Sequence, residues 1–234
     1  MQLTIEPIGI VHSPYKQKFG IPRQPGLVTH ASGVIEILGK YNRPEAFEGI
    51  EQYSHLWLEF YFHQTADKEW KPSVRPPRLG GNKKIGCFAT RSNFRPNNIG
   101  LSVVQFKGLE IKQGQVKLHI AAHDLLDQTP ILDIKPYIPY SDALPQANAG
   151  IFEQAPETTL SVELSSTVES KLVHLENRYP NLTEFIYQVL AQDPRPAYMK
   201  AKANRDDFSI QLYDLDIKWR VQDKQILVTD IISV

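Results

Sequence analysis

The sequence Leu56-Trp57-Leu58-Glu59-Phe60-Tyr61-Phe62 is apolar and aromatic enough to form a central β-strand. A second run, Val116-Lys117-Leu118-His119-Ile120, alternates apolar and polar residues, which is typical of a strand with one buried face. Strands are predicted at residues 3–11, 33–38, 56–62, 85–90, 101–107, 115–123 and 131–134. The clearest helix signal here is short, at residues 43–49. This pattern predicts a mostly β fold, either a sandwich or a barrel.

The pattern changes after residues 140–157, which have no sustained period and predict a linker. Residues 166–178 and a segment starting near Asn181 carry apolar residues at helical spacing, so they predict two helices joined by a tight turn. Residues 208–212, 215–221 and 225–234 predict strands, with a bulge or bend at Tyr213-Asp214 where the alternation changes phase. We therefore expect a β-barrel or sandwich unit over residues 1–145 and a small α+β unit over residues 160–234.

Length and composition exclude several classes of protein. A chain of 234 residues buries roughly 70% of its unfolded surface, so its core needs no disulfide scaffold. Cys87 is the one cysteine, and cysteine scarcity is typical of a reducing compartment. No apolar run approaches ~18 residues, and the first residues lack the pattern of a secretion signal. We expect a cytoplasmic protein that does not bind a membrane.

Charge is distributed unevenly along the chain, although the formal net charge is zero. Residues 1–109 carry 14 basic and 8 acidic side chains, whereas residues 110–234 carry 12 and 18. Two windows, at residues 7–35 and 70–109, contain no acidic residue. Clustered positive charge attracts a polyanion, which favours an anionic partner. The alternative is a solvated basic face that pairs with carboxylates from the second half of the chain.

Several common chemical motifs are absent. The chain has neither a Walker phosphate loop nor a Gly-x-Gly-x-x-Gly turn, and one cysteine cannot supply a paired-Cys zinc site. His119 and His123 would lie about 13 Å apart on a strand, too far to share a metal ion. We therefore expect no metal site. Cys87 lies in an apolar segment and is expected to be an inert buried thiol. Composition, spacing and charge alone therefore predict only a mostly β protein that binds an anionic partner.

Several segments, taken together in their order and spacing, resemble one family. They are Ser13-Pro14-Tyr15, Pro22-Arg23-Gln24-Pro25-Gly26, Phe62-His63-Gln64, Val74-Arg75-Pro76-Pro77-Arg78-Leu79-Gly80-Gly81, Phe88-Ala89-Thr90-Arg91-Ser92-Asn93-Phe94-Arg95-Pro96-Asn97-Asn98-Ile99-Gly100, Asp133-Ile134-Lys135-Pro136-Tyr137 and Asp193-Pro194-Arg195-Pro196-Ala197-Tyr198. This set resembles the TrmO family, also called TsaA-like or YaeB, of bacterial tRNA methyltransferases, and it spans nearly the whole chain.

The resemblance implies an antiparallel β-barrel that uses S-adenosylmethionine and acts as a homodimer. It also implies methylation of N6 of threonylcarbamoyladenosine at position 37, beside the anticodon of threonine tRNA. A cofactor bound to a barrel accounts for the missing glycine-rich loop, and tRNA phosphates account for the acid-free windows.

The resemblance further implies a set of cofactor-binding positions. They are Pro25, Gly26, Leu27, His63, Gln64, Arg91, Leu101, Ala121, Ala122, His123 and Asp124. Arg91 can pair with the methionyl carboxylate, and Asp124 can accept hydrogen bonds from the ribose hydroxyls or the amino group. Several of these positions have structural alternatives: a tight turn at residues 25–27, capping of a strand end at residues 63–64, and a salt bridge for Arg91. Instead of binding the cofactor, Leu101 could belong to the hydrophobic core, and Asp124 could form an Asx turn.

The family-like segment at residues 133–137 supplies the catalytic candidates. N6 of the acceptor must lose a proton, so Asp133 and Tyr137 are expected to orient its N–H, with Lys135 countering negative charge. A strand followed by a proline turn is the structural alternative. The candidates for binding tRNA are Arg23, Arg75, Arg78, Arg95, Arg195 and Tyr198. We expect the loop at residues 193–198 to turn toward the active face of the barrel.

Two other functions compete with a tRNA methyltransferase. One is a non-catalytic RNA-binding barrel that uses the basic windows without a cofactor. The other is a barrel enzyme that binds S-adenosylmethionine but modifies a different acceptor.

Overall fold

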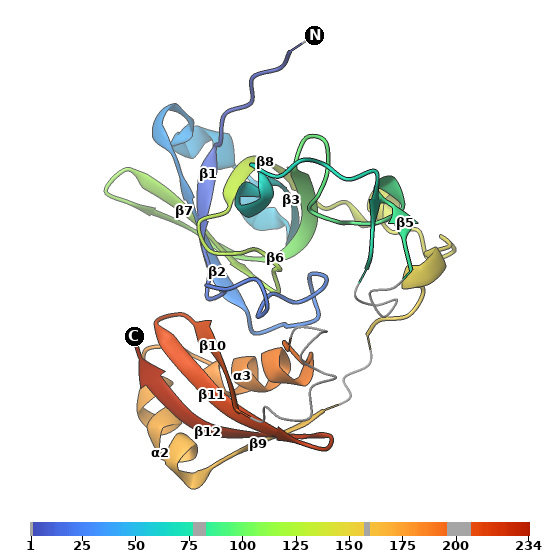
Figure 1. Cartoon of the computed structure of the whole chain (residues 1–234). Coiled ribbons are helices and arrows are strands. Elements are labelled where there is room, and N and C mark those ends of the chain that lie inside the picture. Colours follow the sequence, from blue (N-terminus) through green and yellow to red (C-terminus); the bar gives the residue numbers. More distant parts are fainter. Residues whose placement is uncertain (1, 77–82, 157–159, 196–206) are drawn as a thin grey trace.

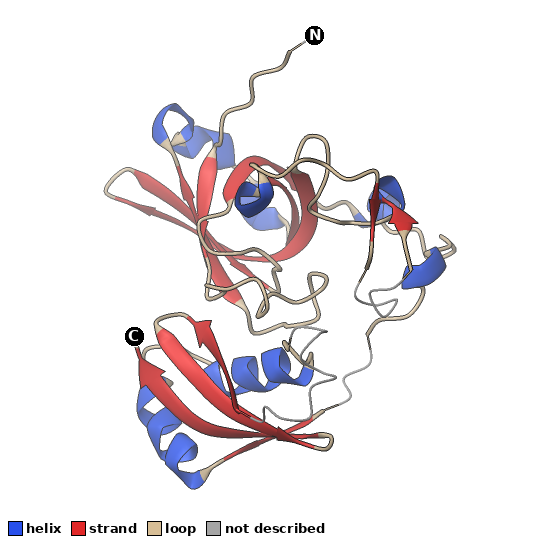
Figure 2. Cartoon of the chain, in the orientation of Figure 1, coloured by secondary structure: helices blue, strands red, loops and turns tan. Residues whose placement is uncertain are grey.

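Six antiparallel strands close into a barrel in the order β1-β2-β7-β6-β3-β8 (Figures 1 and 2). The structure is a computed structural model that describes residues 2–76, 83–156, 160–195 and 207–234. The barrel strands are β1 (Gly9–His12), β2 (Ser32–Ile37), β3 (His55–Tyr61), β6 (Ile99–Lys112), β7 (Gln115–Ala121) and β8 (Pro130–Pro136). The predicted mostly β fold with an antiparallel barrel is confirmed.

Alternation along each strand sorts side chains to the two faces of the barrel wall. Leu56 and Leu58 on β3 are fully buried, as are Val116 and Leu118 on β7. Successive strand residues point to opposite faces, so these side chains fill the barrel while Trp57 and its outward neighbours face away. This core fixes the register, because a slip by one residue would expose every buried side chain.

Two strand predictions in the first part of the chain need correction. The strand expected at residues 3–11 begins only at Gly9, where β1 first pairs with β2 and β8, and Leu3 and Ile5 are exposed. The strand expected at residues 85–90 is reduced to β5 (Ile85–Gly86), because its partner β4 (Ser73–Val74) has two residues. A 3-10 turn, η6 (Cys87–Ala89), replaces the rest.

Two further predictions, a helix at residues 43–49 and a linker at residues 140–157, correspond to segments that contain short helical turns. The helix expected at residues 43–49 is the 3-10 turn η2 (Pro44–Phe47), flanked by η1 (Gly39–Tyr41) and η3 (Ile50–Gln52). The expected linker at residues 140–157 overlaps α1 (Pro139–Asp142) and contains η7 (Gly150–Phe152), and its last residue lies outside the described part. The turn η4 (His63–Thr65) follows β3.

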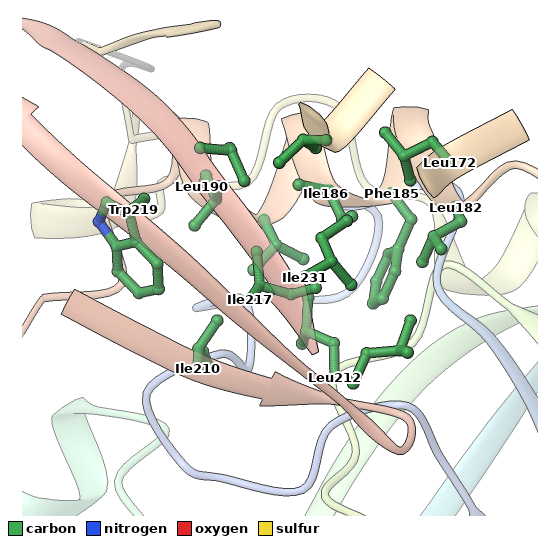
Figure 3. Close-up of a cluster of buried hydrophobic side chains, with 14 of the residues drawn as sticks. Leu172, Leu182, Phe185, Ile186, Leu190, Ile210, Leu212, Ile217, Trp219 and Ile231 are labelled. Atoms are coloured by element: carbon green, nitrogen blue, oxygen red, sulfur yellow. The ribbon is translucent and has the colours of Figure 1, made fainter. Parts of the chain in front are cut away.

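The second unit is a four-stranded sheet in the order β10-β11-β12-β9 with two helices. Its elements are β9 (Ser161–Leu164), α2 (Ser166–Leu175), α3 (Leu182–Ala191), β10 (Asp207–Leu212), β11 (Leu215–Gln222) and β12 (Gln225–Ser233). Figure 3 shows Phe185 and Ile186 of α3 packed toward Leu212 and Ile217 of the sheet. The predicted helical hairpin and three strands are present, but sequence missed β9, which pairs in parallel with β12.

The phase change at Tyr213-Asp214 has a different cause from the one expected. These two residues form the tight hairpin between β10 and β11, with Tyr213 at φ 55° and Leu212 paired with Leu215. The bulge of this sheet lies instead between Lys218 and Trp219, where β11 pairs with β12. A hairpin reverses the strand direction, so the alternation restarts on the new strand.

The two units share a hydrophobic core. Tyr15, Val28 and Ala31 belong to the loop between β1 and β2, yet they are fully buried among side chains of α2, α3 and the second sheet. The ring of Tyr15 lies 5.7 Å from that of Phe185, and the Tyr213 amide donates to the Pro14 carbonyl at 2.8 Å. The second unit therefore holds the β1–β2 loop in place from outside the barrel.

Gln188 on α3 fastens the same loop by hydrogen bonds. Its Oε1 accepts from the His30 amide at 3.1 Å, and its Nε2 donates to His30 Nδ1 at 2.9 Å and to Thr29 Oγ1 at 2.9 Å. Gln188→Ala is expected to lower the free energy of unfolding by about 1–1.5 kcal/mol and the melting temperature by about 2–4 °C. Calorimetry should show no comparable loss for Gln225→Ala, whose side chain is exposed at the start of β12.

Candidate functional site

A pocket of about 970 Å³ opens where one end of the barrel meets the second unit. Six separate segments line it, from the β1–β2 loop, the end of β3 with the turn after it, residues 90–95, the start of β6, the segment after β7 and the end of α3. Among the lining residues are Lys18, Arg23, Gln24, Phe60, Phe62, His63, Gln64, Arg91, Phe94, Arg95, Leu101, Ser102, Asp124, Gln192, Asp193 and Arg195. Its size is within the range of small-molecule sites.

Aromatic side chains form the wall of the pocket at the end of β3. The rings of Phe60 and Phe62 meet edge to face with centroids 5.1 Å apart. Phe60 lies directly over Gly100, where an added Cβ would come within 2.3 Å of the ring. Only glycine permits this close approach of β6 to the ring. Leu101, the next residue, is 50% exposed and lines the pocket, so it is not a core residue.

Asp124 is the carboxylate on the barrel side of the pocket. Ser102 Oγ donates to its Oδ1 at 2.7 Å. Burial raises the pKa of Asp124 to about 6, while the hydrogen bond from Ser102 and the charge of Arg91 act in the opposite direction. A carboxyl group with this pKa gains or loses its charge close to neutral pH.

Arg91 crosses the pocket toward the β1–β2 loop. Its Nη1 donates to Gln24 Oε1 at 2.6 Å, and no described salt bridge occupies it. The structure therefore leaves the guanidinium available for an anionic ligand.

His63 and Gln64 lie in the turn η4, and burial lowers the pKa of His63, so its imidazole is mainly neutral at pH 7.

The remaining cofactor candidates do not line the pocket. Gly26, at φ 81°, donates from its amide to the Ala122 carbonyl at 2.8 Å, which joins the segments 25–27 and 121–124. Neither Pro25, Gly26 and Leu27 nor Ala121 and Ala122 line the pocket; Gln24 and Asp124, at the ends of these segments, do so.

His123 is fully buried, and its ring contacts Tyr15 edge to face at 5.5 Å. Burial lowers its pKa to about 4, so the side chain is neutral and turned into the protein.

The segment after α3 brings a charged pair to the pocket from the second unit. Arg195 donates from Nε to Asp193 Oδ1 at 2.8 Å and from Nη2 to Oδ2 at 3.1 Å, and its guanidinium lies 5.6 Å from the Phe208 ring centroid. Both side chains of the pair line the pocket. The expected turn of this loop toward the barrel is therefore observed as far as Arg195, whereas Tyr198 lies outside the described residues.

The predicted tRNA-binding arginines are only partly brought together. Arg23 and Arg95 line the pocket with Arg195. Arg95 Nη1 donates to the Thr90 carbonyl at 2.8 Å, which fixes its direction. Arg75 lies beside the β4–β5 pair and is exposed, and Arg78 lies outside the described residues.

The three catalytic candidates are placed together on the outer face of the barrel, not in the pocket of the same chain. Lys135 pairs with Glu59 at 3.1 Å and makes a short ion pair with Asp133. The Tyr137 ring lies 5.9 Å from that of Trp57. Asp133 on β8 is paired with Glu59 on β3, and Glu59 is paired with Leu101 on β6, which lines the pocket. Asp133 therefore lies two strand spacings, about 10 Å, from the edge of the pocket.

Sequence reasoning did not single out Ser102 or Gln24. Ser102 had a signal, because it is a lone hydroxyl in the apolar stretch Leu101-Ser102-Val103-Val104, and it is 3% exposed. Gln24 belongs to the family-like segment at residues 22–26, but only the fold shows that it meets Arg91. Among the described residues, no three His, Cys, Asp or Glu side chains are grouped to hold a metal ion. No described helix is long and apolar enough to span a membrane.

A closed antiparallel barrel whose end pocket is walled by a small α+β unit defines a class of two-unit barrel proteins, distinct from doubly wound α/β enzymes. The family model described as the tRNA-methyltransferase O N-terminal domain matches residues 10–143, and that of the TrmO C-terminal domain matches residues 157–234. The chain belongs to the TrmO family.

Relatives cover both units. An Escherichia coli K12 protein named tRNA (adenine(37)-N6)-methyltransferase is 49% identical over 218 residues, 93% of each chain. A Pseudomonas aeruginosa PAO1 protein named putative S-adenosylmethionine-dependent methyltransferase RcsF is 46% identical over 220 residues, 94% of this chain and 93% of its own. The crystal structure of TrmO from Pseudomonas aeruginosa matches with a TM-score of 0.83 and 38% identity, covering 100% of this chain and 99% of that one.

Proposed function

We propose that this chain is an S-adenosylmethionine-dependent methyltransferase that modifies N6 of threonylcarbamoyladenosine at position 37 of threonine tRNA. Family membership and the activity named for the Escherichia coli relative support the reaction. The observation that carries the proposal is the pocket itself, where Arg91, Asp124 and an aromatic wall meet the Asp193–Arg195 pair. Because the proposed substrate is tRNA, the proposed location is the cytoplasm.

The residues of the pocket fit S-adenosylmethionine. When bound, this cofactor supplies an electrophilic methyl group on a sulfonium ion. Arg91 pairs with its methionyl carboxylate, because a planar guanidinium suits bidentate binding. Asp124, held by Ser102, accepts hydrogen bonds from the ribose hydroxyls or the amino group, and Leu101 packs against the adenine.

The remaining cofactor candidates act around this centre. His63 and Gln64 hydrogen-bond the adenosine. The backbone of Pro25, Gly26 and Leu27, joined to Ala121, Ala122 and His123, holds Gln24 and Asp124 at the pocket wall.

Basic residues around the pocket bind the tRNA. Arg23 and Arg95 contact the anticodon loop at the pocket, and the exposed Arg75 binds phosphate farther out. Arg195 is already oriented by Asp193, so it presents its outer edge to the threonyl carboxylate. Arg78 and Tyr198, which belong to the family-like segments, complete this set.

The catalytic candidates act in a homodimer. Asp133, Lys135 and Tyr137 lie on an outer face of β3 and β8 that also carries Trp57. A second copy packed on this face brings its Asp133 to the neighbouring pocket, where the carboxylate accepts the N6 proton. Lys135 counters the charge of Asp133, and Tyr137 orients the N–H.

The proposal is tested with labelled S-adenosylmethionine and two batches of tRNA, one carrying threonylcarbamoyladenosine and one lacking it. Label is expected only in the first batch, and Arg91→Ala should abolish most of it. Label in both batches would show a different acceptor. Binding of tRNA without label in either batch would favour a non-catalytic RNA-binding barrel.

A further inference from the structure

Trp70 and Phe88 form an exposed aromatic pair outside the pocket. Their rings are nearly parallel, with an angle of 26° and centroids 6.5 Å apart. Trp70 is 44% exposed and Phe88 is 73% exposed. Neither residue lines the pocket, and neither belongs to the two buried clusters of the described chain. Burial in the barrel therefore does not explain why two large rings are presented together to solvent.

The backbone beneath this pair is firmly held. The Cys87 amide donates to the Pro72 carbonyl at 2.9 Å, which ties the residue before Phe88 to the segment after Trp70. The short β4–β5 pair extends this contact, and in Figure 1 β5 lies off to one side of the barrel. Cys87 is 1% exposed, and its Sγ donates to the Phe94 carbonyl at 3.3 Å. The two rings are thus presented by an ordered turn.

One cation contacts the pair, and two more lie by Phe94 at the pocket. The Arg95 guanidinium lies 5.7 Å from the Phe88 ring centroid. Lys71 Nζ lies 5.2 Å and Lys68 Nζ 6.0 Å from the centroid of Phe94. Arg95, Phe94 and Lys68 also line the pocket, so one continuous surface runs from the pocket to the aromatic pair. No acidic residue occurs between residues 70 and 109.

We propose that Trp70 and Phe88 are a stacking platform for an unpaired anticodon-loop base that neighbours the base entering the pocket. This inference rests on the proposed function and adds a specific contact to it. Unpaired RNA bases stack on exposed aromatic rings, and adjacent cations bind the phosphates between them. The combination of ring faces with local positive charge fits a nucleic acid better than an apolar protein surface.

The test compares the full-length protein with the double variant Trp70→Ala/Phe88→Ala. The KM for threonylcarbamoyladenosine-bearing tRNA is expected to rise by about fivefold or more, while kcat and the KM for S-adenosylmethionine stay within twofold. The dependence of tRNA affinity on salt should keep its slope, because stacking releases no counterions. Lys71→Ala, by contrast, should reduce that slope by about 1.

Three controls separate stacking from other effects. Tyr53→Ala removes an aromatic ring of similar exposure, 42%, away from this surface and should leave the KM unchanged. Trp70→Phe/Phe88→Tyr keeps two ring faces and should restore tRNA affinity. An anticodon stem-loop with an abasic nucleotide beside position 37 should bind wild-type and the double variant equally.

Two results would overturn the platform. One is a wild-type KM for tRNA in a double variant that retains the wild-type melting temperature. The other is a changed oligomeric state in that variant, which would assign the surface to a protein contact. Failure of the proposed function looks different: wild-type protein would bind tRNA without methylating it, while the double variant still bound tRNA more weakly.

Discussion

Asp133→Asn is expected to lower kcat for tRNA methylation by about 10²- to 10⁴-fold, the usual contribution of a positioned proton acceptor. Asparagine keeps the shape of the side chain but cannot take up the N6 proton. Asp133 lies on the outer face of the barrel and is half exposed, so the variant should fold normally and bind S-adenosylmethionine like the wild type. Single-turnover kinetics together with equilibrium dialysis would separate the two effects. Wild-type kcat in this variant would remove Asp133 from the mechanism.

Mixing two inactive variants tests whether Asp133 serves the pocket of the other subunit. Asp133→Asn keeps an intact pocket, and Arg91→Ala keeps an intact Asp133. A mixed dimer then has one complete site, formed by the pocket of the first variant and Asp133 of the second. After subunit exchange, an equal mixture should recover about a quarter of wild-type activity, because half of the dimers are mixed and each has one working site. Absence of recovery in verified mixed dimers would place Asp133 at its own pocket or outside catalysis.

Asp124→Asn is expected to weaken binding of S-adenosylmethionine by roughly 10- to 100-fold, the value of a charge-assisted hydrogen bond. The wild-type pKa of this carboxyl is about 6, raised by burial. Affinity should therefore be full above pH 7 and fall as the pH drops through about 6, because protonation removes the accepting charge. Calorimetric titration of the cofactor from pH 5 to 8 would measure both effects.

Ser102→Ala supplies the matched control for this pH dependence. The Ser102 hydroxyl lowers the pKa of Asp124, so its removal should move the fall in affinity to higher pH. The Asp124→Asn variant should lose the fall altogether. A fall that persisted in this variant would identify another group, such as His63, as the titrating residue.

Local pattern in the sequence was sufficient for elements that form from neighbouring residues. The apolar and aromatic run Leu56–Phe62 and the alternation at Val116–Ile120 predicted β3 and β7, because each signal arises within a single strand. Helices α2 and α3 followed in the same way from their apolar spacing. The strand β9 escaped notice because its four residues are stabilised by parallel pairing with the distant β12.

The candidate site, too, could be predicted only in part from the sequence. The resemblance to the family implied roles for Arg91, Asp124 and Arg195, and the fold brings them to one pocket from three different segments. Alternation alone could not place His123. Ala122 has φ 56°, a conformation outside the strand region, and the next side chain turns inward against Tyr15.

By itself, the sequence determined the class of fold, most of the strands and helices, the basic windows and the family. The tertiary structure alone decided that Tyr15 is buried in the second unit, that Gln24 meets Arg91, and that Asp133 lies on the outer face of the barrel, two strands from the edge of its own pocket. The physical reason is that burial and alternation are encoded within a few residues. Barrel closure and the contact between units instead depend on which distant strands and loops pair, and no local period specifies that choice.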